Sequence, residues 1–173
     1  MLIKRATPAI AEAIAALRNA AADHLTKQYG KGYGSGQCSD RGVLSDMNRG
    51  GAVYVARIGK RLVGTMTLGT RKPWAIDSLY FASSRASLYL TNMAVTPAHQ
   101  RTGVGRALLE EAARIATRWP ADAIRLDAFD ADSGAGAFYA KCGFREVGRK
   151  SYRTVPLIYY EMLIRPAAVR GRG

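Results

Sequence analysis

The sequence predicts one α/β domain, and three observations support that fold class. The chain has 173 residues, the usual size of a single domain with a sizeable core. Its 48% hydrophobic and 9% aromatic residues are typical of a folded globular protein. Strand-like runs alternate with helical patterns, most clearly from Leu88 to Leu109, where a β-branched and aromatic run ends at Val95 and a helical pattern follows a Pro97 turn.

The N-terminus predicts a short strand and a long helix. Residues 2–6 form the strand, and Thr7 and Pro8 are expected to act as N-cap and first residue of the helix. His24 lies near the helix end and is expected at the surface, as a partner of the helix dipole, rather than as a catalyst. One apolar face recurs at helical spacing: Ile10, Ile14, Leu17, Ala21 and Leu25.

A glycine-rich loop over 29–36 follows, with four glycines in eight residues. It is either a mobile connector or an acceptor-side loop whose Tyr29 and Tyr33 close over a substrate. A cap at 39–40 then starts a short helix that reaches Met47 and stops around Gly50.

The middle of the chain predicts a β-hairpin and then a long loop. Residues 53–58 and 62–68 flank the turn residues Gly59-Lys60. Residues 71–86 lack a clear period and are expected to pack as a loop against the sheet. Three aromatic residues of this loop are expected in the core rather than over a pocket: Trp74, Tyr80 and Phe81.

The C-terminal part predicts a helix from Gly103 that ends at Pro120, with Leu108, Ala112, Ile115 and Trp119 on its apolar face. A buried strand is expected over 124–129. A short helix follows, with start signals at Asp130, Asp132 and Ser133 and an end at Gly143. Two strands over 144–152 and 157–164, with Pro156 between them, and a disordered basic tail over 165–173 complete the chain.

Charge and composition restrict the partners. The net charge of +13 raises the hypothesis of a nucleic-acid partner, but the basic residues are spread along the whole chain, which disfavours that role. A diffuse positive field favours phosphates, including those of a coenzyme. No apolar run suits a membrane span or signal peptide, so a cytoplasmic protein without membrane contact is expected. Cys38 and Cys142 lack metal-ligand spacing, so reduced thiols and no metal are expected.

The junction after Val95 has the chemistry of an anion site. The first N–H groups of a helix lack backbone partners, and glycines let a bound group approach the main chain. A P-loop would need a Gly-Lys pair before Ser or Thr, and a dinucleotide fingerprint would need a third glycine where Leu108 stands. The remaining pattern, Gln100-x-x-Gly103-x-Gly105, resembles the acyl-coenzyme-A signature of the GNAT acetyltransferase superfamily.

A second motif strengthens the resemblance. Residues 132–144 read Asp132-x-x-Ala-x-x-Phe-Tyr139-x-Lys141-x-Gly-Phe, similar to the helix that carries Asn, Ala, Tyr and a closing Gly-Phe in this superfamily. The two motifs occur in the expected order, and the order of elements over 1–164 also resembles that of a GNAT domain.

The resemblance implies a mixed central sheet of about six to seven strands, helices on both faces, and strands around Val95 and Ile124 splayed to admit acetyl-CoA. Tyr139 would face the coenzyme sulfur. Asp132 departs from the usual Asn, so it would either contact the pantetheine or simply cap its helix. Implied coenzyme contacts are the main chain of Met93, Ala94 and Val95, the signature residues Gln100, Arg101, Thr102, Gly103, Val104, Gly105 and Arg106 around the pyrophosphate, and Asp132 and Lys141 of the second motif.

Acetyl transfer to an amine needs a neutral nucleophile and a proton for the leaving thiolate. A phenol titrates near 10 and a thiol near 8.5, so Tyr139 is the expected general acid. No carboxylate lies between Leu88 and Val95, where many relatives place a Glu. Asp127, Glu161 and Asp77 remain open as candidates for the base, and a water chain or an acceptor of lower pKa would also suffice, so no base is assigned from the sequence.

The expected function is N-acetylation of a primary amine of a small molecule, amino acid or peptide. Two alternatives stay open: acetylation of a nucleic-acid-associated target, such as charged tRNA or a basic protein, and a non-catalytic acyl-CoA-binding module. The oligomeric state is also open, with a homodimer as the base-rate alternative.

Overall fold

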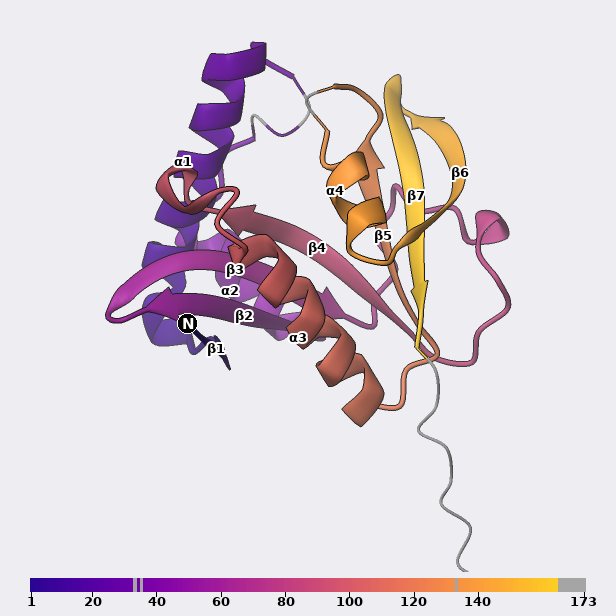
Figure 1. The fold of residues 1–173 in the computed structure, drawn as a ribbon, viewed down its shortest axis with the longest axis horizontal. Helices are drawn as coiled ribbons and strands as arrows, with labels where there is room; N and C mark the ends of the chain where they lie inside the picture. Colours follow the sequence, from indigo (N-terminus) through magenta and orange to yellow (C-terminus); the bar gives the residue numbers. More distant parts are fainter. Residues whose placement is uncertain (33, 35, 133, 165–173) are drawn as a thin grey trace, which may run out of the picture.

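Seven strands form one mixed sheet in the order β1-β2-β3-β4-β5-β7-β6 (Figure 1). The computed structural model describes residues 1–32, 34, 36–132 and 134–164. The strands are β1 (Leu2–Arg5), β2 (Gly51–Ile58), β3 (Arg61–Gly69), β4 (Ser87–Val95), β5 (Ala123–Phe129), β6 (Arg145–Tyr152) and β7 (Val155–Leu163). Only the β4–β5 pair is parallel, so the expectation of a mixed sheet of about six to seven strands is confirmed.

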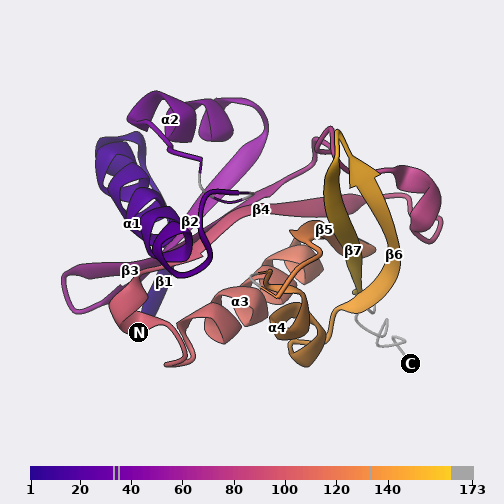
Figure 2. The same ribbon diagram turned by 90° about the horizontal axis from the view of Figure 1, so that it is seen from above.

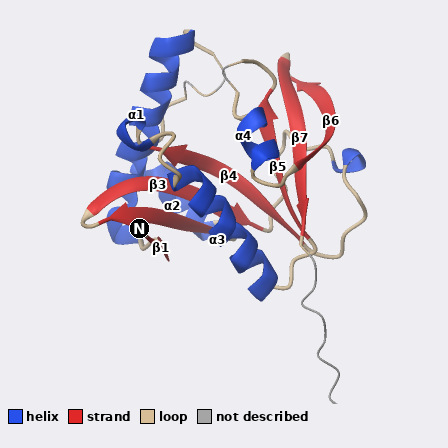
Figure 3. Ribbon diagram, in the orientation of Figure 1, coloured by secondary structure: helices blue, strands red, loops and turns tan. Residues whose placement is uncertain are grey.

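Helices cover both faces of this sheet, as Figures 2 and 3 show. α1 (Ala11–Tyr29) and α2 (Asp40–Asn48) lie on one face, while α3 (Val104–Arg118) and α4 (Gly136–Lys141) lie on the other. A large core packs α3 and α4 against the strands through side chains such as Leu108, Leu126 and Tyr160. A smaller core joins α1, α2 and β2 around Ile14, Val43 and Val53. The two layers therefore fix the sheet from both sides.

The first helix starts later than its sequence signals indicate. Pro8–Ile10 forms a 3₁₀ turn, and α1 begins only at Ala11 with Ile10 as its N-cap. Thr7 precedes the 3₁₀ turn, but its side chain makes no capping hydrogen bond. Thr7 and Pro8 therefore hold the expected N-cap and first positions, but of the 3₁₀ turn that leads into α1 rather than of α1 itself, and main-chain bonds carry the chain on into the helix.

Local signals were more reliable in the next segments. The Ser39 hydroxyl accepts a hydrogen bond from the N–H of Gly42 at 3.2 Å and caps α2, as expected. β2 and β3 form the predicted hairpin about Gly59. α3 ends at Arg118, before Pro120, but Trp119 lies beyond the helix and is 44% exposed rather than on its buried face.

The long loop over 71–86 packs less deeply than expected. Phe81 is buried beside Tyr159, which confirms one of three aromatic predictions. Trp74 is 82% exposed and Tyr80 is 37% exposed, so their placement in the core was wrong. A 3₁₀ turn over Ser78–Tyr80 directs this stretch along the surface, held by a hydrogen bond from the N–H of Leu79 to the carboxylate of Asp77.

The last elements differ from the prediction in two details. α4 begins at Gly136 with Ala135 as its N-cap, so neither Asp130 nor Asp132 caps it. Pro156 lies inside β7 rather than before it, and its carbonyl accepts a hydrogen bond from the N–H of Asp130. Tyr33, Ser133 and the expected tail over 165–173 lie outside the described residues.

Candidate functional site

The candidate site is the gap that opens between β4 and β5. The two strands pair only from Ser87 to Tyr89 on β4, opposite Ala123 to Arg125 on β5, and then diverge (Figure 1). Beyond this point β4 pairs with β3, and β5 pairs with β7. A cavity of about 590 Å³ fills the gap, with walls from α1, β4, β5 and the segment before α4.

The edge of β4 forms one wall of the cavity. Residues 90–95 line it, including Met93, Ala94 and Val95, three of the residues expected to contact the coenzyme. The ladder with β3 shifts register in this stretch, since Thr65 pairs with Ala94 but Thr67 pairs with Thr91. This is a β-bulge, which bends a strand and redirects its main-chain groups.

The turn from β4 to α3 brings the signature residues beside this edge. Gln100 lines the cavity, and its side-chain N–H group donates to the carbonyl of Val95 at 3.3 Å. The hydroxyl of Thr102 donates to the carbonyl of His99 at 2.7 Å, which closes the turn. Arg101 and Arg106 are exposed, so their positive charges face solvent beside the start of α3.

The start of α3 presents unpaired main-chain donors, and its two glycines have different roles. The N–H of Ala107 makes the first helical hydrogen bond, to Gly103, so the N–H groups of 104–106 precede the helical ladder. Gly103 is the N-cap in a left-handed conformation, φ 91°, with open space where a Cβ would lie. At Gly105 a Cβ would come within 3.0 Å of Phe138, so packing of α4 explains that glycine.

Tyr139 on α4 reaches the same cavity from the opposite face of the sheet. Its ring is 9% exposed and packs against Phe144 and Tyr160, with ring centroids 5.8 and 6.1 Å away. Its hydroxyl lies 4.0 Å from the sulfur of Met93. The packing fixes the phenol at the point where β4 and β5 separate.

The structure separates the three candidate bases. Asp127 on β5 lines the cavity together with Tyr139. Glu161 is buried in an ion pair with Arg125, at 3.0 Å. Asp77 forms an ion pair with Lys150 in a different hollow, and that hydrogen bond lowers the pKa of the Asp77 carboxyl below its ordinary value. Of the three candidates, Asp127 is the one that lines this cavity.

Other expected contacts lie outside the cavity. Arg101, Thr102, Gly103, Val104, Gly105 and Arg106 belong to the turn and helix beside it and do not line it. Asp132 and Lys141 are exposed and also do not line it.

Burial raises the pKa of the free Cys142 thiol, which lies near the end of α4.

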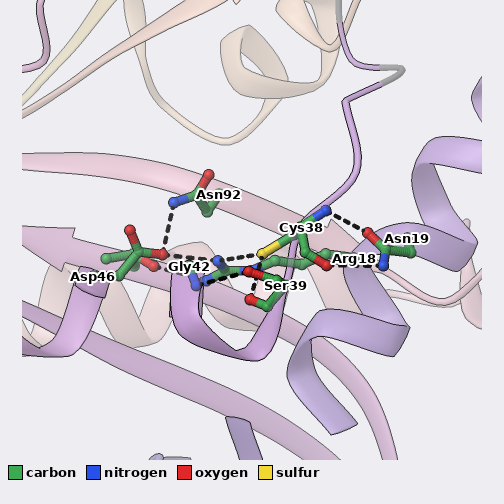
Figure 4. Close-up of polar contacts among 8 residues, drawn as sticks. Arg18, Asn19, Cys38, Ser39, Gly42, Asp46 and Asn92 are labelled. Atoms are coloured by element: carbon green, nitrogen blue, oxygen red, sulfur yellow. Dashed lines mark hydrogen bonds and ion pairs between the residues drawn. The ribbon is translucent and has the colours of Figure 1, made fainter. Parts of the chain in front are cut away.

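The wall contributed by α1 was missed by sequence reasoning. Arg18, His24 and Gln28 line the cavity, together with Cys38 from the following segment. Arg18 is buried and pairs with Asp46 on α2 at 2.8 Å, as Figure 4 shows. A basic residue one turn after Ile14, on the apolar face of α1, was the available signal for this site.

Within the described part of the chain, no three His, Cys, Asp or Glu side chains are grouped so that they could hold a metal ion. No helix in the same residues has the length and hydrophobicity needed to cross a membrane.

Comparisons with known proteins identify the family. The chain shares its fold with ribosomal-protein-S18-alanine N-acetyltransferase from Escherichia coli (TM-score 0.73, 18% identity, 98% of this chain and 97% of the other). Similar matches are a structure from Salmonella typhimurium with its cofactor acetyl-CoA (0.68, 18%, 99% and 98%) and aminoglycoside 6′-acetyltransferase type Ii (0.66, 19%, 96% and 99%). No curated protein sequence gives a match. Residues 49–146, more than half of the chain, match the model of the acetyltransferase (GNAT) domain, and the protein therefore belongs to the GNAT acetyltransferase family.

Proposed function

We propose that the protein transfers the acetyl group of acetyl-CoA to a primary amine of a small molecule, amino acid or peptide. The observation that carries the proposal is that Tyr139 and Asp127 line one cavity in the gap between β4 and β5. An acid and a base are thus available on opposite sides of a space that a thioester and an amine can share. The matched GNAT enzymes include acetyltransferases named for a ribosomal-protein alanine and for aminoglycosides, so the fold alone does not select the acceptor.

The features beside the cavity suit a long donor that carries phosphates. The N–H groups at 104–106 precede the helical ladder of α3, where the helix dipole favours an anion. Arg101 and Arg106 add full positive charges at the same end. The edge of β4 over Met93 to Val95 offers main-chain groups to an extended arm. Acetyl-CoA, when bound, supplies an acetyl group activated as a thioester.

In the proposed reaction the two side chains move protons in opposite directions. The Asp127 carboxylate accepts a proton from the ammonium group of the acceptor, which makes the nitrogen nucleophilic. An amine of pKa near 10 is only about one part in a thousand neutral at pH 7, which adds roughly 4 kcal/mol to the barrier if nothing assists the deprotonation. The nitrogen bonds to the acetyl carbon, the bond from that carbon to sulfur breaks, and the Tyr139 hydroxyl donates its proton to the sulfur. The nitrogen then releases its second proton to water, and the Tyr139 phenolate takes up a proton from water, which leaves a neutral amide, free thiol and the phenol restored.

The first experiment measures thiol release from acetyl-CoA across a panel of amines, amino acids and peptides, with mass spectrometry of the products. Amine-dependent release with an acetylated product supports the proposal. Tight coenzyme binding without release on any acceptor would instead support a non-catalytic module. Release only with charged tRNA or a basic protein, and sensitivity to salt, would support a nucleic-acid-associated target.

Asp127→Asn tests the base with the best acceptor from that panel. We expect kcat/KM for the amine to fall about 100-fold at pH 7 and to recover above pH 9, where the free amine no longer needs a base. Asp130→Asn is the matched control, since Asp130 pairs with Arg149 at 2.9 Å and does not line the cavity. An equal loss at every pH would exclude the base role.

A further inference from the structure

We propose that Asp46, held by Arg18, is a positioning residue that fixes the bulge of β4 at Asn92 and thereby the cavity edge used for acetyl transfer. This inference rests on the proposed function for its kinetic test. The starting observation is the backbone of Asn92, which has φ 51° in the left-handed region although it is not glycine. Asparagine adopts this conformation more readily than most residues, but it still needs support from its surroundings.

The support comes from a single carboxylate oxygen. The Asn92 side-chain N–H group donates to Oδ2 of Asp46 at 3.0 Å, and Nη1 of Arg18 donates to the same oxygen at 2.8 Å (Figure 4). Asp46 lies on α2 and Arg18 on α1, so two helices reach the bulge through one atom. The second amino group of Arg18 donates to the hydroxyl of Thr67 on β3, at 3.0 Å.

These hydrogen bonds connect the bulge of β4 to the neighbouring strand β3. Thr67 pairs in the sheet with Thr91, the residue immediately before Asn92 on β4. The path from Asn92 through Asp46, Arg18 and Thr67 therefore returns to β4 one residue from its start. Between the pairs Thr65–Ala94 and Thr67–Thr91, one residue of β3, Met66, stands opposite two residues of β4, Asn92 and Met93. The sheet alone therefore constrains the backbone of β4 less here than in a regular ladder.

The hydrogen bonds among Asn92, Asp46, Arg18 and Thr67 form a network at the wall of the cavity. Arg18, Asn92 and the following residues of β4 all line the cavity. Arg18 also approaches the sulfur of Cys38 at 3.8 Å, and Asn19 makes two hydrogen bonds to the main chain of Cys38. The network thus fixes the α1 wall and the β4 edge relative to each other.

The energetics favour positioning over stability as the role of this pair. Compared with apolar side chains in the same place, such an ion pair contributes little net stability, because desolvation offsets the attraction between the charges, although removal of one partner alone is costly. Among the described residues, Nε of Arg18 is buried and finds no hydrogen-bond partner, which adds a further cost. We therefore assign to the Arg18–Asp46 pair the role of holding Asn92 in its left-handed backbone conformation.

The test compares Asn92→Gly and Asp46→Ala with a control. Asn92→Gly keeps the left-handed conformation accessible but removes the tether, and we expect kcat to fall about 10- to 100-fold with a smaller change in KM for acetyl-CoA. The double variant is expected to lose no more than Asp46→Ala alone. Asp46→Asn keeps an acceptor oxygen and is expected to restore most of kcat. Thr154→Gly, at φ 73° in the exposed β6–β7 turn, is the matched control with unchanged kcat.

A second readout does not need turnover. Amide hydrogen exchange over residues 91–95 is expected to become faster in Asn92→Gly and Asp46→Ala, and to stay unchanged in Thr154→Gly. Unchanged exchange, or losses in kcat that multiply in the double variant, would overturn the positioning role. An inactive wild-type protein would contradict the proposed function, while the exchange measurement would still decide whether the tether holds the bulge.

Discussion

Two arginine–carboxylate pairs, each with a buried arginine, occupy different regions of the molecule. Arg18–Asp46 links α1 to α2 beside the cavity, whereas Arg125–Glu161 joins directly paired residues of β5 and β7 away from it. Arg125 also donates to the carbonyl of Ala82 and lies 4.9 Å from the ring of Phe81. The second pair therefore holds the loop over 71–86 on a fully paired part of the sheet.

The difference shows that one type of interaction has two consequences in this fold. β5 pairs with β7 along the whole length of β5, so the sheet itself fixes their register and loss of Arg125–Glu161 is expected to lower stability. β4 leaves the ladder beyond Tyr89 on its β5 side, so geometry there depends on side chains such as Arg18 and Asp46. Variants in the two regions should accordingly separate stability from turnover.

The largest expected effect on stability is at Glu161. Glu161→Ala leaves the buried Arg125 without its partner, which is expected to lower the free energy of unfolding by about 3 to 5 kcal/mol. Urea denaturation measures this loss, while kcat per folded molecule is expected to stay unchanged. The double variant Arg125→Met with Glu161→Leu should recover most of the stability. A loss of kcat in the folded fraction would remove the contrast between the two regions.

Tyr139 should show the opposite behaviour. Tyr139→Phe keeps the ring packing but removes the proton donor, so kcat is expected to fall about 100-fold, or roughly 2.7 kcal/mol of barrier, with little change in coenzyme affinity. Tyr160→Phe is the control, because Tyr160 lies in the same core and does not line the cavity. Equal turnover in the two variants would exclude the acid role of Tyr139.

The third prediction uses two glycines with the same backbone conformation. Gly103 has φ 91° at the start of α3, and Gly143 has φ 90° after α4. Alanine at either position is expected to cost about 1 to 2 kcal/mol of stability, because left-handed backbone is strained for any residue with a Cβ. Only Gly103→Ala should also raise KM for acetyl-CoA. If KM rises in both variants or in neither, the start of α3 does not bind the coenzyme.

The smallest expected effect is the pH dependence of the stabilisation that Asp122 contributes. Its carboxylate accepts hydrogen bonds from the N–H groups of Arg85 and Ala86, which hold the pKa of Asp122 below its ordinary value. A lowered folded-state pKa means that the stabilisation is present above the unfolded value, about 3.9, and is lost as the pH falls through the folded value. The difference in Tm between wild type and Asp122→Asn should therefore be constant from pH 5 to 8 and shrink towards pH 3. A difference that persists at pH 3 would contradict this origin.

The sequence predicted most of the fold, because most of its elements follow from local signals. The Ser39 cap, the hairpin about Gly59 and the end of α3 before Pro120 each depend on a few neighbouring residues. The predictions of burial were wrong where the position of a side chain depends on contacts between distant parts of the chain. Trp74 and Tyr80 are apolar or aromatic by type, but a 3₁₀ turn stabilised by Asp77 keeps their loop at the surface. Thr7 holds its expected N-cap position, but among the described residues its side chain makes no capping hydrogen bond.

The predicted parts of the candidate site belong to recognisable motifs, and Tyr139 of the second motif lines the cavity. Residues 93–95 and Gln100 belong to one strand and turn, and they line the cavity. The α1 wall was not found, because Arg18 meets Asp46 and Asn92 only after three separate elements have packed. For the same reason the sequence left three carboxylates open as the base, and of these three only Asp127 lines the cavity in the folded chain.

A crystal structure with bound coenzyme A tests the central claim most directly, through the distance between its sulfur and the hydroxyl of Tyr139. We expect the arm to run along Met93 to Val95 and the sulfur to lie in the gap between β4 and β5, within about 3.5 Å of that hydroxyl. A coenzyme bound elsewhere, or a sulfur that points away from Tyr139 and Asp127, would contradict the assignment of this cavity as the acetyl-transfer site.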